Sequence, residues 1–305
     1  MDPRRVLVFR TVARSGSLSA AARELGTTQS AVSQQLRQLE REAGGPLLLR
    51  TARGTQLTEA GVALLAHADT IHGALHLARG ELDALAEARG GVVRLVSFPS
   101  GAATLVPPAL RALREERPEV EVTLVETEPP EAWASVLAGE ADVALVFGYD
   151  GPPAEDGALA WVPLGVEPLS LVVPPGSAPD DVDASWLAAQ DWVAGCERCR
   201  QHLVSCCRTA GFEPRLLHES DDYVAVQNLV AHGFGVTVLP HLALSAFRHP
   251  DVELRRSDLF GARHVGMVHR RGAEAVPAVR ALMERMQTAA KAVLGRRRRR
   301  AAGDG

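Results

Sequence analysis

Aromatic residues are scarce in this chain of 305 residues: phenylalanine, tyrosine and tryptophan together make up only 4% of it. The chain has no unbroken apolar run of about 18 residues and no amino-terminal h-region, so we expect neither membrane insertion nor export. Gly233-Phe234-Gly235 lacks the remaining glycines of a phosphate-binding fingerprint and does not predict nucleotide binding. We therefore expect a cytoplasmic protein with no membrane partner and no cofactor.

A catalytic constellation is also missing, because no nucleophile, base and orienting group stand in a recognisable arrangement. Single histidines such as His218 and His232 are interpreted as structural residues, and an enzyme is not expected. The 46% of hydrophobic residues can bury substantial cores, and the length predicts two or three domains. The chain carries a formal net charge of −4, yet residues 1–60 hold nine arginines against five acidic residues. This basic end favours a polyanionic partner.

Residues 18–42 predict two short helices joined by a tight turn at Gly26, where a C-terminal cap requires positive φ. Thr27 or Thr28 then caps the second helix. That helix has one apolar stripe at helical spacing, formed by Val32, Leu36, Leu39 and Ala43. This is the layout of a helix-turn-helix.

The opposite face of the second helix is polar. Glutamine can bond bidentately to adenine, arginine can bond to guanine or phosphate, and serine or threonine adapts to either. The candidate DNA contacts on this helix are Thr28, Gln29, Ser30, Ser33, Gln34 and Arg37. An ordinary helical hairpin with a solvated polar face is the alternative.

Two short β-prone runs at 47–49 and 55–57 flank an arginine-containing turn. They predict a β-wing, with Arg53 at its tip and Arg50 at its base placed to reach phosphates or a minor groove. A surface hairpin with two solvated arginines is the alternative. Residues 1–58 are thus expected to form an all-α winged helix-turn-helix domain that binds double-stranded DNA.

Residues 59–89 predict a long linker helix, with Thr58 as its N-cap and no proline inside. Its apolar residues alternate spacings of four and three, which favours pairing with a second long helix. This seam is formed by Leu64, Ala68, Ile71, Leu75, Ala78, Leu82 and Leu85. We expect a homodimer or homotetramer; a helix packed on its own domain is the alternative.

Strands alternate with helices over residues 90–294, which predicts an α/β domain. The expected strands are 92–96, 120–126, 141–147, 169–173, 192–194, 215–218, 236–239 and 264–269. The expected helices are 102–116, 130–138, 202–210, 222–232 and 276–293. The arginine run at 296–300 predicts that residues 295–305 form a basic, disordered tail.

The segments LSAAARELGTTQSAVSQQLRQLE and LLLRTARGTQLTEAG, with the long helix after them, resemble the N-terminus of a LysR-type transcriptional regulator. GEADVALVFG at 139–148 and LVAHGFGVTVLP at 229–240 resemble the effector domain of that family. The resemblance implies two subdomains of periplasmic-binding-protein type, about 90–164 with 264–294 and about 165–263. A small-molecule effector would bind between them, and RNA polymerase would be a partner if the protein is an activator. A solute-binding protein or an enzyme with a helical extension is the alternative.

Ligands of open α/β sheets collect at strand carboxyl ends and helix N-termini, where backbone N–H groups are free. The candidate effector contacts are Ser97, Pro99, Ser100, Gly101, Glu126, Thr127, Glu128, Phe147, Gly148, Gly195, Cys196, Arg198, Ser220, Asp221 and Asp222. The charge of the effector stays open, because this set contains both arginine and carboxylates. A helix cap or a solvated loop charge is the alternative for each residue.

All four cysteines, Cys196, Cys199, Cys206 and Cys207, lie in one segment around His202. Cys-x-x-Cys is a spacing typical of redox or metal sites, and these five residues could ligate zinc. Three interpretations stay open: thiols without regulatory chemistry, a thiol-redox switch, and a metal-responsive site. The segment also resembles that of the family's peroxide-sensing member, which implies Cys199 and Cys207 as the disulfide pair.

Overall fold

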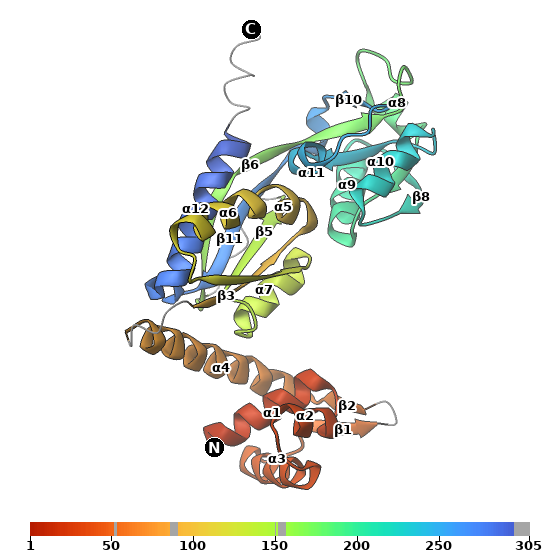
Figure 1. Cartoon of the computed structure of the whole chain (residues 1–305). Helices are drawn as coiled ribbons and strands as arrows, with labels where there is room; N and C mark the ends of the chain where they lie inside the picture. The colour runs from red at the N-terminus through yellow and green to blue at the C-terminus, as the bar shows by residue number, and fades with distance from the viewer. Residues whose placement is uncertain (52–53, 86–90, 150, 152–156, 296–305) are drawn as a thin grey trace.

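The computed structural model describes residues 1–51, 54–85, 91–149, 151 and 157–295. A small helical domain, the long helix α4 and a larger α/β domain follow one another along the chain (Figure 1). Arg53 and the expected basic tail beyond residue 295 lie outside the described residues. No described helix is both long and apolar enough to cross a membrane.

The N-terminal domain contains α1 (Pro3–Ser15), α2 (Leu18–Glu24) and α3 (Gln29–Ala43), of which α1 was not predicted from the sequence. The turn between α2 and α3 has its left-handed residue at Gly26, with φ of 59°, as expected. Thr28 caps α3 by accepting a hydrogen bond from Ala31 N at 3.2 Å. The predicted stripe Val32, Leu36 and Leu39 is buried, whereas Ala43 at the last turn is exposed.

The expected wing is an antiparallel hairpin of β1 (Leu48–Thr51) and β2 (Gly54–Leu57). Both the backbone N–H and the hydroxyl of Thr55 donate to Gly16 O at 3.0 Å. These bonds attach the wing to the turn between α1 and α2.

The linker helix α4 spans Glu59–Leu85, and Thr58 Oγ1 accepts from Gly61 N at 3.0 Å as the predicted cap. The first half of the predicted seam, Leu64, Ala68 and Ile71, packs into the core of the N-terminal domain. This half of the seam therefore packs on its own domain, which was the alternative interpretation. Farther along α4, Leu75 and Leu82 are 55% and 62% exposed.

The first part of the α/β domain contains β3 (Val92–Ser97), α5 (Pro99–Thr104), α6 (Val106–Glu116), β4 (Glu121–Glu126), α7 (Pro129–Leu137) and β5 (Val143–Gly148). Strand β3 pairs in parallel with both β4 and β5, so the carboxyl ends of these strands lie at one edge. The single helix expected at 102–116 is two helices that meet at Leu105.

Two long strands cross between the two subdomains: β6 (Leu159–Val173) and β11 (Ala262–Arg270), which pair antiparallel. Strand β11 also pairs with β5 in the first subdomain, and the far end of β6 pairs with β9 (Thr237–Pro240) and β10 (Glu253–Arg255) in the second. The strand expected at 169–173 is therefore only the end of a strand of 15 residues. Helix α12 (Pro277–Leu294) returns to the first subdomain and packs on α6.

The second subdomain completes the domain with α8 (Ala184–Ala188), β7 (Asp191–Ala194), α9 (Glu197–Thr209), β8 (Arg215–Glu219), α10 (Tyr223–Ala231) and α11 (His241–Ala246). The short elements α8, α11 and β10 were not predicted, because they hold too few residues to show a period. Two single 3-10 turns, Asp258–Phe260 and Ala273–Ala275, flank β11.

A polar contact joins α4 to the α/β domain through Asp142, which lies just before β5 and is 8% exposed. His76 Nε2 of α4 lies 2.9 Å from Asp142 Oδ1, and Arg94 of β3 donates to both carboxylate oxygens. Burial raises the pKa of this carboxyl, but the hydrogen bonds from His76 and Arg94 outweigh burial and lower it to about 2. The ionised form of Asp142 therefore stabilises the folded chain.

The pKa of Asp142 in the folded chain lies below its ordinary value of 3.8. This stabilisation is therefore complete at a pH above about 3.8 and is lost as the pH falls through about 2. The loss from this one group is on the order of 2 kcal/mol. We expect Asp142→Asn to be less stable at neutral pH and to lose less unfolding free energy across this window. Urea unfolding at fixed protein concentration measures both quantities, with Glu115→Gln in an exposed ion pair as the control. An Asp142→Asn curve parallel to that of wild type contradicts the assignment.

Candidate functional site

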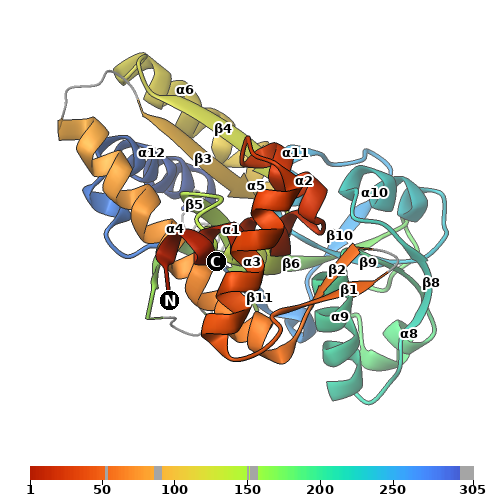
Figure 2. The same cartoon turned by 90° about the horizontal axis from the view of Figure 1, so that it is seen from below.

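Helix α3 lies at the end of the molecule farthest from the α/β domain (Figure 1), the end nearest the viewer in Figure 2, and its polar side chains form one face. Gln29, Ser30, Gln34 and Arg37 are exposed on it, and Ser33 is partly exposed. Helix α3 is held in place by its buried stripe, so these side chains project from a rigid element. Their donors and acceptors match those of base edges in a major groove.

Exposed side chains on this face contact one another locally. Arg37 Nη1 donates to Ser33 Oγ at 3.4 Å, and the hydroxyls of Thr28 and Ser30 lie 3.0 Å apart. Both contacts are exposed, so water or a phosphate can replace them at little cost. The backbone of Arg50 lies in β1 of the wing, opposite Thr55 of β2.

A cavity with about 760 Å³ of empty space, partly open to solvent, lies between the two subdomains. Its wall takes residues from both subdomains and from the crossing strand β11. Eight of the candidate effector contacts line it: Pro99, Ser100, Glu128, Phe147, Gly195, Cys196, Ser220 and Asp221. A largely apolar cavity with a few polar groups is the usual form of a small-molecule site.

The other candidate effector contacts do not line this cavity: Ser97, Gly101, Glu126, Thr127, Gly148, Arg198 and Asp222. Ser97 is fully buried and donates to Phe98 O. Gly101 packs directly under the Phe98 ring, where a Cβ would lie 2.8 Å from Cζ. Asp222 serves as the N-cap of α10 by accepting from Val224 N at 2.8 Å. Local folding thus uses the polar side chains of Ser97 and Asp222.

Arg263 of β11 is the main cavity residue that sequence reasoning missed. It is 3% exposed, forms an ion pair with the fully buried Glu167 of β6 and donates to Ser100 Oγ at 2.7 Å. Its guanidinium also lies over the rings of Phe98 and Phe147, at 4.9 and 4.2 Å from their centroids. Glu167 in turn accepts from the backbone N–H of Leu242 at the start of α11. Arg263 thereby joins both subdomains at the point where the chain crosses.

The cavity wall also holds a dithiol. Cys196 Sγ and Cys199 Sγ lie 2.9 Å apart, and Cys196 donates to Glu128 Oε2 at 3.5 Å. Burial raises the pKa of the Glu128 carboxyl above its ordinary value. Cys199 accepts from Tyr149, whose ring stacks on His202 with centroids 3.7 Å apart.

The structure does not bring together Cys199 and Cys207, the disulfide pair that the resemblance implies. Both lie on α9, eight residues apart, which separates them by about 12 Å along the helix axis. Burial raises the pKa of Cys207 to about 12, so this thiol stays protonated in the core. Among the described residues, no three His, Cys, Asp or Glu side chains converge in a way that could hold a metal. His202 Nε2 lies 2.9 Å from Phe260 O, and Cys206 Sγ lies 3.5 Å from the same nitrogen.

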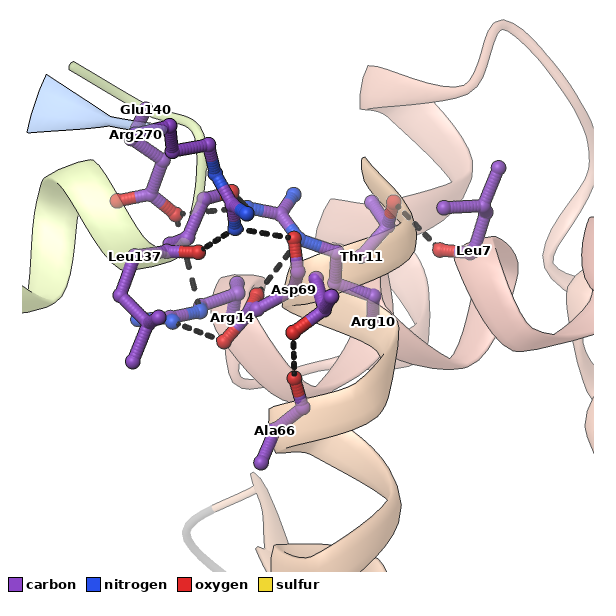
Figure 3. A network of polar contacts seen from close by, with 11 residues as sticks. Leu7, Arg10, Thr11, Arg14, Ala66, Asp69, Leu137, Glu140 and Arg270 are labelled. Atoms are coloured by element: carbon purple, nitrogen blue, oxygen red, sulfur yellow. Dashed lines mark hydrogen bonds and ion pairs between the residues drawn. The ribbon is translucent and has the colours of Figure 1, made fainter. Parts of the chain in front are cut away.

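The N-terminal domain is attached to the α/β domain by a polar network, the interdomain ion cluster, defined as Arg10, Arg14, Asp69, Glu140 and Arg270 (Figure 3). Arg10 of α1 donates to Asp69 Oδ1 at 2.8 Å and to Ala138 O at 2.8 Å. Arg270, at the end of β11, donates to Asp69 O at 3.1 Å and to Leu137 O. The cluster therefore connects α1, the linker helix and the C-terminal end of α7.

The remaining members close the cluster from the solvent side. Arg14 pairs with Asp69 at 2.5 Å, and Glu140 pairs with Arg10 at 3.2 Å. The linker helix lies close because both facing residues are glycines: a Cβ on Gly139, which has φ of 71°, would lie 2.8 Å from Gly73 Cα. No local pattern in the sequence signals this contact.

Comparison with known proteins identifies both domains. Residues 3–62 match the family described as bacterial regulatory helix-turn-helix protein, lysR family, and residues 86–291 match the LysR substrate binding domain. The HTH-type transcriptional regulator AlsR of Bacillus subtilis (strain 168) is 30% identical over 267 residues, or 85% of this chain and 86% of AlsR. The nitrogen assimilation regulatory protein nac of Klebsiella aerogenes is 31% identical over 250 residues, or 80% and 79% of the two chains.

Solved structures share the fold. A full-length OxyR variant from Pseudomonas aeruginosa superposes with a TM-score of 0.71 at 21% identity, covering 94% of this chain and 95% of that one. CbnR in complex with its target DNA superposes with a TM-score of 0.59 at 23% identity, covering 95% and 100%. The expected resemblance is thus confirmed, and so is the prediction of a regulator rather than an enzyme. The chain belongs to the LysR family of transcriptional regulators, with an N-terminal helix-turn-helix domain that binds DNA and a C-terminal effector-binding domain.

Proposed function

We propose that this regulator reads its operators with α3 and the wing, and that a small molecule in the cavity around Arg263 controls this binding. The observation that carries the proposal is the course of β11. Arg263 in the cavity wall and Arg270 in the interdomain ion cluster lie on this one strand, about 23 Å apart along its length.

The strand offers a mechanical route from ligand to DNA. A ligand that contacts both subdomains stabilises one relative placement of them, by as much as its affinity for the two placements differs. Arg263 holds the two subdomains in this placement through its ion pair with Glu167 and its hydrogen bond to Ser100. Arg270, at the other end of the strand, contacts the linker helix and α7, so a change of subdomain placement reaches the N-terminal domain.

The cavity favours a largely apolar effector with a few hydrogen-bonding groups. The wall of the cavity includes the aromatic rings of Phe98, Phe147 and Phe260. The charge of Arg263 is already balanced by its ion pair with Glu167. Glu128 and Asp221 add carboxyl groups to the wall. We propose that the protein works in the cytoplasm, where its DNA lies, and that RNA polymerase is a partner at promoters that it activates.

We also propose that two copies pair through the second half of the linker helix. Leu75 and Leu82 are exposed with Ala78 between them, at the spacing of a heptad seam. Two copies would present two recognition helices, which suits an operator made of two half-sites.

A salt-titrated binding assay tests the function. The specific probe is DNA from immediately upstream of the protein's own gene, and the competitor is an unrelated fragment of equal length. We expect the first to bind at least about a thousandfold more tightly at physiological salt. Equal, strongly salt-dependent binding to both fragments would show nonspecific attraction of a basic surface to DNA, and would contradict sequence-specific recognition.

Arg37→Ala tests the contact face of α3. We expect the variant to lose about 1–3 kcal/mol of operator-binding free energy. If Arg37 bonds phosphate, the affinity should fall equally for all DNA sequences and its dependence on salt should decrease. If Arg37 reads a base, the loss of affinity should depend on one base position of the operator. The matched control is Arg111→Ala, which removes one exposed arginine from α6 in the α/β domain. Unchanged affinity for Arg37→Ala would exclude Arg37 from the interface.

The double variant Leu75→Lys with Leu82→Lys tests the pairing. Placing two like charges on the seam should shift wild-type dimers to monomers, as measured by sedimentation at equal concentrations. The control is Val62→Lys, because Val62 is 58% exposed on the same helix but lies off the seam. A double variant that sediments as wild type does would move the interface elsewhere.

A further inference from the structure

The cavity wall contains two thiols that are already in contact. Cys196 is the residue before α9 and Cys199 lies in its first turn. Their sulfur atoms are 2.9 Å apart, and a disulfide needs a further approach to about 2.05 Å. Both thiols line the cavity, whereas Cys206 and Cys207 do not.

The surroundings of the two thiols make them chemically unequal. The hydrogen bond from the Cys196 thiol, together with the Tyr149 hydroxyl and the charge of Arg263, outweighs burial and lowers the pKa of Cys199 below its ordinary value. The same hydrogen bond and burial raise the pKa of Cys196. Cys199 is therefore the thiol of the pair that ionises more readily.

We propose that Cys196 and Cys199 form a reversible redox site in the wall of the effector cavity, oxidised by a small hydroperoxide that enters the cavity. The Cys199 thiolate attacks the outer oxygen of the hydroperoxide, the O–O bond breaks, and an alcohol or water leaves as Cys199 becomes a sulfenic acid. The Cys196 thiol then attacks the Cys199 sulfur, the S–O bond breaks, and water leaves as the disulfide forms. In sum the two thiols lose two electrons and two protons, and the hydroperoxide takes up both.

The disulfide changes contacts that bridge the two subdomains. Cys196 donates across the cleft to Glu128, which begins α7 in the first subdomain, and the disulfide removes that donor. Tyr149 follows β5 in the first subdomain and donates to Cys199 of α9, and the disulfide removes the thiolate that accepts this bond. Oxidation therefore alters the same subdomain placement that an effector alters. In this respect the redox site rests on the proposed function of the cavity.

The direct test is to treat the reduced full-length protein with hydrogen peroxide and to count free thiols. Cleavage before Asp191 and Asp221 yields one peptide with all four cysteines. We expect the loss of two thiols, a peptide lighter by two hydrogen atoms with the bond located at Cys196 and Cys199, and full reversal by dithiothreitol. No thiol loss, or a bond that includes Cys206 or Cys207, overturns the proposal.

Single variants separate the two chemical steps. Cys199→Ser should slow the reaction with peroxide at least about tenfold, because the thiolate is lost. Cys196→Ser should keep the first step and accumulate a sulfenic acid on Cys199, which dimedone traps. Cys206→Ser is the matched control and should react as wild type does. Equal peroxide rates for Cys199→Ser and wild type would overturn the assignment of the reactive thiol.

Operator binding measured on the same samples distinguishes this proposal from the proposed function. We expect oxidation to change operator affinity by about fivefold or more in wild type and Cys206→Ser, and not in Cys199→Ser. A disulfide that forms without changing the affinity overturns the coupling of the redox site to DNA binding. Failure of both the reduced and the oxidised protein to bind the operator would instead count against the proposed function.

Discussion

The buried ion pair between Arg10 and Asp69 is the interaction on which the arrangement of the two domains depends. The two residues are 7% and 5% exposed, so removing either partner leaves a buried charge with only its second counter-ion, Arg14 or Glu140, which destabilises the contact. Arg10 also donates to Ala138 O at the end of α7, where helix carbonyls have no intrahelical partner. One guanidinium thus holds the N-terminal domain, the linker helix and the effector-binding domain together (Figure 3).

This arrangement gives the sheet of the first subdomain a role beyond packing. Strand β11 pairs with β5 and β6 over its length, so it is braced on both sides between its two ends. Arg263 at one end and Arg270 at the other are both buried and both held by ion pairs or by carbonyl oxygens. A braced strand with fixed ends transmits displacement better than a loop would, which is the physical basis of the proposed coupling.

Local patterns in the sequence predicted much of the fold. The stripe Val32, Leu36 and Leu39 fixed the buried face of α3, and alternating apolar runs located most strands, because burial and period are local properties. Contacts between distant residues left no such signal: Arg10 meets Asp69 across 59 positions, and Arg263 meets Ser100 across 163. For this reason the cavity prediction named strand ends and helix starts, but missed the arginine that joins them.

The central claim is that the interdomain ion cluster fixes the DNA-binding domain on the effector-binding domain. The most direct measurement is a pulsed electron paramagnetic resonance distance between spin labels on unnatural amino acids at Glu24 of α2 and Glu131 of α7, which are both exposed. Diluting labelled with unlabelled chains restricts the signal to distances within one chain. We expect one narrow distance distribution for wild type and a broad one for Asp69→Ala. Distributions of equal width would show that the cluster does not hold the domains together.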